Sequence, residues 1–529
     1  MRFRSFNKAA LLAATLVAVS FAQTAPPPDL DAWVARSMKT FEVPGISIAI
    51  VKDGKVVLAK GYGVRKLGEA ALVDEHTDFG IASNSKAFTA AALAMLVDEG
   101  RISWDDQVQK ALPSFQMYDP YVTREMRIRD LLCHRSGLGL GAGDLLFWPD
   151  TDVTRDQVVA ALRFIRPQTS MRTRYAYNNL MFVVAGQVVA AVSGKSWDDF
   201  VRERIFAPLG MNDTRISMTS FKPGDNFATP HSRGWRLEGE LRPIKGTQDV
   251  TWAAAAGIKS NAADMAKWIE MQLNHGLLDN GKRLFSEAAQ REMWSPQIAI
   301  PVREASGPLA ATTPNFHGYG LGWDLRDYRG HKVVSHGGAL TGMVSSVTMI
   351  PDLKLGIVIL TNQEETGAYS AILYHILDHY LGAPAADWIE AYHSSAMEQR
   401  ARANAAEKKF EQSRAADSKP ALALEKYAGE YTDAWYGKAT LRLENGKLTM
   451  AMSRTPAMVG DLEHFQYDTF KVIWRDNTIP DAFVTFNIDY RGNISEMTMR
   501  PVSSLADFSF DYQDLLFRPA RAAAARSAN

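Results

Sequence analysis

A serine and a lysine three positions apart, in Ser83-Asn84-Ser85-Lys86, are the residues of this chain most suited to chemistry. On a helix this spacing places the hydroxyl and the amine on one face, within reach of each other. Ser83 could instead be only a helix cap, but the reciprocal capping box has Glu or Gln where this chain has Lys86. The positive end of the helix would lower the pKa of the amine, so that it could take a proton from a serine near neutral pH.

A second motif, Tyr177-Asn178-Asn179, contains a phenol that could take part in proton transfer. A phenol near an ammonium group can be partly ionised and can pass a proton to a leaving group. The alternative is a buried tyrosine whose hydroxyl is simply hydrogen-bonded. This triplet therefore supports a reactive site only in the company of other motifs.

A third motif, Val334-Ser335-His336-Gly337-Gly338-Ala339, combines a β-rich run with two glycines. The glycines would let a substrate lie close along the backbone while a following N–H points at a developing oxyanion. A strand that ends in a glycine turn is the alternative. Together the three motifs predict a nucleophile, a base and an oxyanion hole, and hence an acyl-enzyme formed on Ser83.

These residues resemble the penicillin-recognising serine hydrolases, in which Ser-x-x-Lys is followed by two companion motifs. The resemblance is closest to the class C β-lactamase branch, with its Tyr-x-Asn second motif. The third motif there is Lys-Thr-Gly or a His-x-Gly variant, as in some D-alanyl-D-alanine carboxypeptidases, D-aminopeptidases and esterases. Further likeness in residues 126–138, 205–212 and 256–265 extends it over about residues 30 to 380.

The resemblance implies a role for each motif residue. Ser83 would attack the carbonyl, and Lys86 and Tyr177 would share the proton transfers, with the acylation base left open between them. Asn179 would hold Lys86 and the acyl side chain of the substrate. The backbone N–H groups of Ser83 and Ala339 would form the oxyanion hole.

The third motif departs from the β-lactamase pattern at the substrate-binding strand. His336 stands where many β-lactamases have a lysine that binds the substrate carboxylate, and Gly337, before Gly338, replaces a hydroxyl residue. A neutral imidazole and a glycine would bind an anionic β-lactam less well. We therefore expect a serine hydrolase that cleaves amide or ester bonds as a D-amino-acid peptidase, a carboxylesterase or a weak β-lactamase. An acylated sensor or binding protein without efficient turnover is the alternative.

Composition indicates which partners the protein can bind and whether disulfides can stabilise its fold. The chain has 529 residues, which suggests two or more domains. Lys plus Arg and Asp plus Glu both number 59, so no basic field would attract nucleic acid. Cys133 is the only cysteine and cannot form an intramolecular disulfide; we expect a small buried residue there. We expect a small-molecule or peptide substrate and no cofactor.

The N-terminus is typical of an export signal. Arg2, Arg4 and Lys8 precede an apolar run at residues 9–22, which ends in small residues suited to cleavage. We expect residues 1–22 to be removed and the protein to be periplasmic or secreted. An uncleaved anchor is the alternative, although the run is short for a spanning helix. No later stretch predicts a membrane span.

Residues 28–390 are predicted to form an α+β domain of the β-lactamase and penicillin-binding-protein type. A β-hairpin around Asp53-Gly54 and a buried helix over residues 83–99 open it, and a mostly helical middle follows. Strands are then expected at residues 332–335, 345–350 and 355–361. Strands at both ends predict one mixed sheet with a helical insertion.

Residues 394–420 are predicted to be an exposed helix or linker, because they are rich in Ala, Glu, Lys and Arg with little apolar periodicity. Residues 421–520 are predicted to form a small all-β, barrel-like domain, with hairpin turns at Asn445-Gly446 and Arg491-Gly492. This domain resembles the lipocalin-like domain often fused to these hydrolases. We expect its aromatic residues to form its core: Tyr427, Tyr431, Trp435 and Tyr436.

Three other chemistries are not supported. The chain has no Gly-x-Ser-x-Gly elbow, so neither His134 nor His336 need be the base of a catalytic triad. His375 and His379 are four apart, but the metalloprotease Glu does not follow the first, and we assign no metal. The alternating glycines at 137, 139, 141 and 143 predict a flexible loop near the site rather than a nucleotide cradle.

Overall fold

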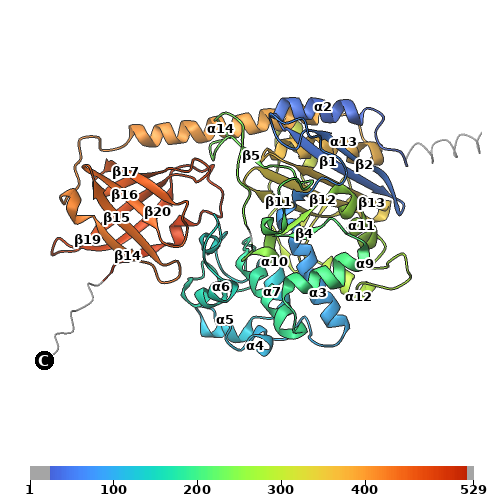
Figure 1. Cartoon of the computed structure of the whole chain (residues 1–529), viewed down its shortest axis with the longest axis horizontal. Coiled ribbons are helices and arrows are strands. Elements are labelled where there is room, and N and C mark those ends of the chain that lie inside the picture. The colour runs from blue at the N-terminus through green and yellow to red at the C-terminus, as the bar shows by residue number, and fades with distance from the viewer. Residues whose placement is uncertain (1–23, 249, 521–529) are drawn as a thin grey trace, which may run out of the picture.

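The computed structural model describes residues 24–248 and 250–520, so the predicted export signal lies outside the described residues. A larger body carries a sheet and most of the helices, and a smaller β-barrel lies beside it (Figure 1). One long helix, α14 (Trp388–Gln412), runs from the larger body to the barrel. The segment predicted as an exposed helix or linker is therefore the rest of this helix followed by a short coil.

An eight-stranded sheet forms the frame of the larger body, in the order β2-β1-β13-β12-β11-β10-β9-β8. The predicted α+β fold is confirmed. Every pairing in this sheet is antiparallel, however, so the sheet does not mix parallel and antiparallel strands as we expected. Short hairpins join most neighbours, and a hairpin makes neighbours antiparallel. The strands are β1 (Gly45–Lys52), β2 (Lys55–Gly63), β8 (Ile298–Ala299), β9 (His317–Tyr319), β10 (Asp324–Tyr328), β11 (His331–Leu340), β12 (Met343–Ile350) and β13 (Leu355–Thr361).

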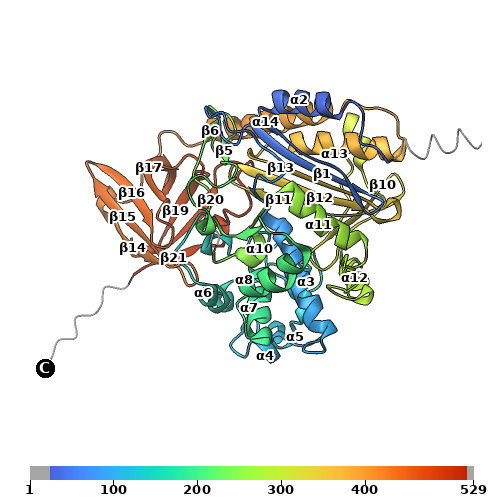
Figure 2. The same ribbon diagram turned by 45° about the vertical axis from the view of Figure 1, so that its right-hand side comes forward.

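Both faces of the sheet are covered, which explains its apolar sequence. In β1 the side chains of Ile46, Ile48 and Ile50 pack with helices α2 (Leu30–Phe41) and α13 (Thr366–Leu381), whereas Ala49 and Val51 belong to the core on the other face. Alternate side chains of a strand point to opposite faces, so β1 joins two cores. Figure 2 shows α2 and α13 above the sheet and α11 (Ala262–Leu273) and α3 (Ser85–Asp98) below it.

The helical insertion lies between β2 and β8 and surrounds a buried helix, α3 (Ser85–Asp98). The predicted helix is confirmed, but it begins two residues later than expected, after a 3₁₀ turn at Ala82–Asn84. All residues of α3 from Ser85 to Leu96 are buried, and its alanines allow the close approach of α7 and α10. The other helices of the insertion are α4 (Val108–Ala111), α5 (Pro120–Glu125), α6 (Arg155–Ala161), α7 (Leu180–Ser193), α8 (Trp197–Val201), α9 (Ala207–Leu209), α10 (Ala253–Ala256), α11 and α12 (Glu287–Met293).

Two small sheets complete the larger body. The first contains β3 (Phe79–Gly80), β7 (Ile258–Ser260) and β4 (Arg215–Ile216). Its strand β3 directly precedes the 3₁₀ turn that carries Ser83. The second pairs β5 (His231–Ser232) with β6 (Arg242–Pro243). Among the described residues no single helix has the length and apolarity of a membrane span. Leu180–Ser193 and Trp197–Leu209 reach these limits only when taken together, and they are bent by 76°.

The C-terminal domain is a closed eight-stranded barrel, as the all-β prediction required. Asn445 and Gly446 have φ values of 51° and 75°, the conformation that a two-residue hairpin turn needs. The four aromatic residues assigned to its core are buried. The strands are β14 (Gly429–Thr432), β15 (Lys438–Glu444), β16 (Lys447–Met452), β17 (Val459–Gln466), β18 (Thr469–Trp474), β19 (Ala482–Ile488), β20 (Ile494–Pro501) and β21 (Leu516–Pro519).

Candidate active site

Ser83 lies on a 3₁₀ turn that the sheet holds in place. The preceding residue, Ala82, has a φ of 50°, a left-handed conformation that is uncommon for a residue with a Cβ. The carbonyl of Ile81 accepts hydrogen bonds from Ser345 Oγ at 2.8 Å and from Asn84 Nδ2 at 3.2 Å. Strand β12 therefore fixes the turn and the direction in which the Ser83 hydroxyl points.

Lys86 lies one turn further along α3, with its amine directed at Ser83. Lys86 Nζ is 2.9 Å from Ser83 Oγ, 2.7 Å from Asn179 Oδ1 and 3.0 Å from the carbonyl oxygen of Ala255. Burial lowers the pKa of Lys86 from 10.5 to about 7, while the charge of Asp144 opposes the shift. Burial, rather than the helix end considered in the sequence, is thus the main reason why this amine can be neutral near pH 7.

Tyr177 contacts both residues but stays a neutral phenol. Its ring centroid is 4.8 Å from Lys86 Nζ, and its hydroxyl is hydrogen-bonded to Ser83. Burial raises the pKa of Tyr177 well above 10, so the partial ionisation expected from the sequence was wrong. The buried ring of His134, 4.2 Å away between centroids, packs against Tyr177 and fixes its position.

His336 faces the same space from β11 and is neutral. Its Nδ1 is 2.6 Å from the carbonyl of Gly337 and its Nε2 is 2.8 Å from Tyr319 Oη. A carbonyl can only accept, so Nδ1 carries the hydrogen and Nε2 accepts from Tyr319. Burial, assisted by the charge of Lys86, lowers the pKa of His336 to about 4. The imidazole therefore offers no positive charge to a substrate carboxylate at neutral pH.

The two glycines of the third motif have different surroundings. A Cβ on Gly338 would lie 2.3 Å from the carbonyl oxygen of Ile81 and 2.4 Å from Ser345 Oγ. Only glycine therefore allows β11 to approach the turn that carries Ser83. A Cβ on Gly337 would meet nothing nearer than Tyr369 Oη at 3.9 Å, so space is open beside it. Ala339 follows on the same strand and also lines the cavity.

Sequence reasoning missed Asp144, a fully buried carboxyl group that supports the site. Asp144 Oδ2 accepts a hydrogen bond from Asn179 Nδ2 at 2.8 Å, which orients the Asn179 oxygen towards Lys86. Burial raises the pKa of Asp144 to about 7. The only indication in the sequence was its place beside the glycine loop at residues 137–143. That loop does lie at the site, where the N–H of Gly141 donates to the Tyr177 carbonyl at 2.9 Å.

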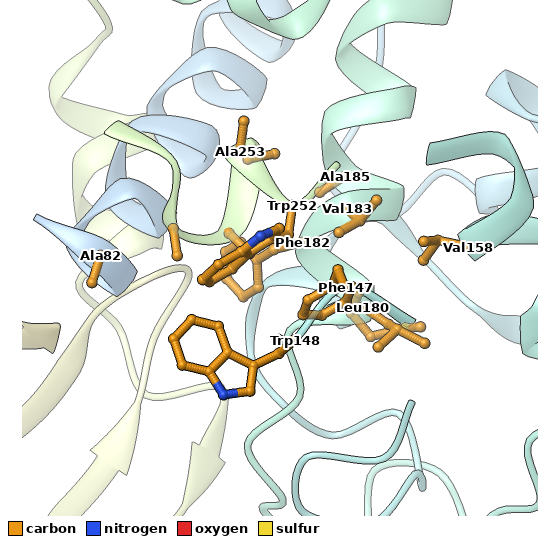
Figure 3. Close-up of a cluster of buried hydrophobic side chains, with 14 of the residues drawn as sticks. Ala82, Phe147, Trp148, Val158, Leu180, Phe182, Val183, Ala185, Trp252 and Ala253 are labelled. Atoms are coloured by element: carbon orange, nitrogen blue, oxygen red, sulfur yellow. The ribbon is translucent and has the colours of Figure 1, made fainter. Parts of the chain in front are cut away.

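A cavity of about 700 Å³ opens over Ser83. One wall is aromatic: the rings of Phe147 and Trp252 stack at 5.6 Å and Trp148 meets Trp252 edge-on at 5.2 Å. Figure 3 shows these three side chains near Ala82, beside the turn that carries Ser83. Strand β11 forms another wall, and residues of the barrel domain close the cavity on a further side. The side of the cavity next to Ser83 is therefore apolar, as the walls of ligand pockets usually are.

Cys133 and His375, which the sequence did not favour as a nucleophile or a metal ligand, lie outside the cavity. Cys133 is buried in the core, and burial raises the pKa of its thiol to about 12. His375 stacks on Trp33 and bonds to Asp29, away from the cavity. Across the part of the chain that the structure describes, no three His, Cys, Asp or Glu side chains are grouped to hold a metal ion.

The comparisons with known proteins agree with this geometry. The family model described as Beta-lactamase matches residues 30–381. The chain belongs to the Beta-lactamase family. A second model, a domain of unknown function called DUF3471, matches residues 413–519, which contain the barrel. The two family models thus divide the chain into a Beta-lactamase part and a part that contains the barrel.

Members of the family that resemble this chain include hydrolases. It is 30% identical over 429 residues to the "Unguisins hydrolase ungD'" of Aspergillus campestris, covering 78% of this chain and 77% of that protein. It is 30% identical over 326 residues to penicillin-binding protein 4 of Amycolatopsis lactamdurans, covering 60% of this chain and 81% of that protein. The octameric penicillin-binding protein homologue from Pyrococcus abyssi has the same fold, with a TM-score of 0.59, 23% identity, and coverage of 93% and 99% of the two chains.

Proposed function

We propose that this protein is a serine hydrolase that cleaves an amide or ester bond through an acyl-enzyme on Ser83. One observation carries the proposal: a buried lysine amine lies 2.9 Å from the Ser83 hydroxyl, with its pKa lowered to about 7. A neutral amine at that distance can take the hydroxyl proton as the oxygen attacks a carbonyl. The hydrolases among the similar family members support the same reaction class.

Lys86 is the acylation base in this mechanism, and Tyr177 is a proton carrier. The raised pKa of Tyr177 keeps the phenol protonated, so it cannot begin by accepting a proton. Its hydroxyl, hydrogen-bonded to Ser83, can give a proton to the leaving group and regain one from Lys86. Water then enters the aromatic-walled cavity, attacks the ester on Ser83 and releases the second product.

The negative oxygen that forms on the substrate carbonyl would lie between Ser83 and β11. The N–H groups of Ser83 and Ala339 are assigned to it, because both residues line the cavity where the 3₁₀ turn meets the strand. The close approach that Gly338 permits brings these two backbone segments together. Oriented N–H donors of this kind stabilise the transition state of acyl transfer.

The test is release of product from three model substrates by the purified mature protein. p-Nitrophenyl acetate, nitrocefin and a D-alanyl p-nitroanilide represent an ester, a β-lactam and an amide. Sustained release from one of them that depends on Ser83 supports the proposal and identifies the bond. A single stoichiometric burst would instead indicate a protein that is acylated without turnover.

The pH profile gives a second prediction. Since the pKa of Lys86 is lowered to about 7, kcat/KM should rise with pH and level off above a midpoint near 7. Below that pH the amine is an ammonium group and cannot accept a proton. The measurement follows p-nitrophenyl acetate hydrolysis from about pH 5 to about pH 9, corrected for the spontaneous reaction. A rate that is still rising steeply at about pH 9 would show an amine with an ordinary pKa and would count against Lys86.

A third prediction concerns β-lactams. Gly337→Thr adds a hydroxyl in the open space beside β11, at a position whose backbone is not left-handed. We expect acylation by nitrocefin to become about tenfold faster, because one hydrogen bond to the substrate carboxylate contributes about 1.4 kcal/mol. Gly337→Ala fills the same space without the hydroxyl and should not do so. An equal gain in both variants would show that shape, not hydrogen bonding, limits β-lactam binding.

A further inference from the structure

The barrel domain reaches into the candidate active site. Five residues of the segment between strand β20 and the short helix before β21 line the cavity over Ser83: Leu505, Asp507, Phe508, Ser509 and Phe510. The ring of Phe508 meets Tyr177 edge-on, with 5.7 Å between centroids. Phe508 is 38% exposed, although it belongs to a buried interface, because it borders the open cavity. The part of the chain matched by a domain of unknown function is thus in contact with a reactive residue.

A continuous chain of hydrogen bonds joins this segment to the nucleophile. Ser509 Oγ donates to Asp144 Oδ2 at 2.9 Å, and Asn179 Nδ2 donates to the same oxygen at 2.8 Å. Asn179 Oδ1 in turn accepts from Lys86 Nζ at 2.7 Å, and Lys86 is 2.9 Å from Ser83 Oγ. Ser509 is 365 positions from Asp144 in the sequence and belongs to the other domain.

The same segment also holds the loop that carries Asp144. Asp511 Oδ2 accepts from the N–H of Gly143 at 2.6 Å, and its Oδ1 accepts from the N–H of Leu145 at 3.0 Å. The carboxyl group of Asp511 therefore binds the backbone on both sides of Asp144. A Cβ on Gly141 would lie only 2.4 Å from the carbonyl oxygen of Phe508, so the two backbones are in close contact. Asp511 is fully buried, and each of its two carboxyl oxygens accepts one of these backbone N–H groups.

We propose that the barrel domain is part of the catalytic machinery: Ser509 and Asp511 are positioning residues that hold Asp144, and through Asn179 they orient Lys86 towards Ser83. Neither residue touches the reacting atoms. This inference rests on the proposed function, since it assigns a role to the barrel in that reaction. It gives the DUF3471 part of the chain a specific task, which is to complete the hydrogen-bond network of a site built in the other domain.

The electrostatics of Asp144 predict how loss of the barrel contact would appear. Besides the Asp144–Lys86 pair itself, the titratable groups that interact with Asp144 or Lys86 are Tyr177, Asp507, Asp511, His134 and His336. The hydrogen bond from Ser509 lowers the pKa of Asp144, and the negative charge of Asp144 raises the pKa of Lys86. Without the Ser509 hydroxyl, Asp144 stays protonated to higher pH. Lys86 then loses a neighbouring negative charge, so its own pKa falls.

The experiment compares Ser509→Ala with the wild-type full chain. We expect kcat to fall about tenfold or more with KM changed less than about twofold, because the substrate still binds while the base is misdirected. The midpoint of the acidic limb of the pH profile should move to lower pH. The melting temperature should stay close to that of the wild type. Ser509→Thr keeps the hydroxyl and should restore both kcat and the midpoint.

The matched control is Ser495→Ala, which removes an exposed barrel serine that bonds only to the carbonyl of Asn487. It should leave kcat and the pH midpoint unchanged. Wild-type kcat and an unmoved midpoint in Ser509→Ala would overturn the inference, as would a folded Ser509→Thr protein that is as slow as Ser509→Ala.

A second readout separates this failure from failure of the proposed function. A fluorophosphonate probe labels an activated serine, and intact mass measures the rate without requiring turnover. Slower labelling of Ser83 in Ser509→Ala supports the inference even if the wild type does not turn over. Equal labelling rates in the two proteins overturn the inference alone. No labelling of wild-type Ser83, together with no product release, overturns the proposed function and the inference with it.

Discussion

Ser83→Ala protein is expected to release product at least about 10⁴-fold more slowly than the wild type and to form no covalent adduct. The reason is that alanine removes the hydroxyl group that lies 2.9 Å from the neutral amine of Lys86 and is proposed as the nucleophile. The fold should be retained, because Ser83 lies at the edge of the cavity and its turn is held through Ile81 and Asn84. Initial rates on p-nitrophenyl acetate and intact mass after incubation measure the two effects.

Ser335→Ala is the matched control for this variant. Ser335 lines the same cavity from β11, and among the described residues its hydroxyl makes no hydrogen bond to a side chain that could take its proton. Its removal should change kcat/KM less than about threefold, the size of a lost peripheral contact. Hydrolysis by Ser83→Ala at the wild-type rate would rule out the acyl-enzyme mechanism, because another nucleophile or an activated water molecule would then attack the substrate.

Lys86→Met should lower kcat/KM about 10³-fold and remove the acidic limb of the pH profile. Methionine has a similar length and is apolar, so it can occupy the buried channel beside Asn179 and Ala255 without its own charge. The serine hydroxyl then has no base within hydrogen-bonding distance apart from a neutral phenol. kcat/KM measured between about pH 5 and about pH 9 tests both effects at once.

Stability provides an internal check on the Lys86 variant. Burial of the amine is what lowers its pKa, so the folded protein carries a desolvation cost at that position. We therefore expect the melting temperature of Lys86→Met to be no lower than that of the wild type. Lys332→Met, at an exposed lysine that donates to the Trp294 carbonyl, should not change the pH profile. Wild-type activity in a folded Lys86→Met protein would transfer the role of base to Tyr177.

The barrel contact has a wider consequence for substrate selection. Residues of the barrel close one side of the cavity, so its width depends on how the two domains are held together. Outside the site, the domains are joined by further contacts such as the ion pair of Arg454 and Asp152 at 3.1 Å. A substrate that needs more room would have to fit beside Phe508 or displace it. Family members with another domain in this place would present a different wall to their substrates.

Local pattern determined much of the fold and the identity of the reactive pair. Ser83 and Lys86 are one helical turn apart, and such a spacing brings two side chains together wherever the helix lies. The hairpins at Asp53-Gly54 and Asn445-Gly446 were predictable for a similar reason, since both turns have the left-handed backbone that these residue types favour. The short apolar run of β13 and the alternating apolar residues of β15 likewise specified strands without any knowledge of their neighbours.

Features that depend on distant residues could not be predicted in this way. The sequence suggested a partly ionised Tyr177 and a helix end acting on Lys86, but burial keeps the phenol neutral and accounts for most of the lowered amine pKa. Burial is a property of the packed chain, because it depends on every element that excludes water from a group. The direction of strand pairing in the sheet was also settled by connections that residue types alone did not reveal.

The sequence by itself therefore determined the Ser83–Lys86 pair proposed as nucleophile and base and the two-part architecture, since each follows from short-range pattern. Only the tertiary structure decided that Asp144 supports Asn179 and that Ser509, 365 positions away, supports Asp144. No periodicity or motif links residues so far apart. Their contact exists because the barrel is packed against the glycine loop, where buried carboxyl groups require hydrogen-bond donors from whichever segment folding brings there.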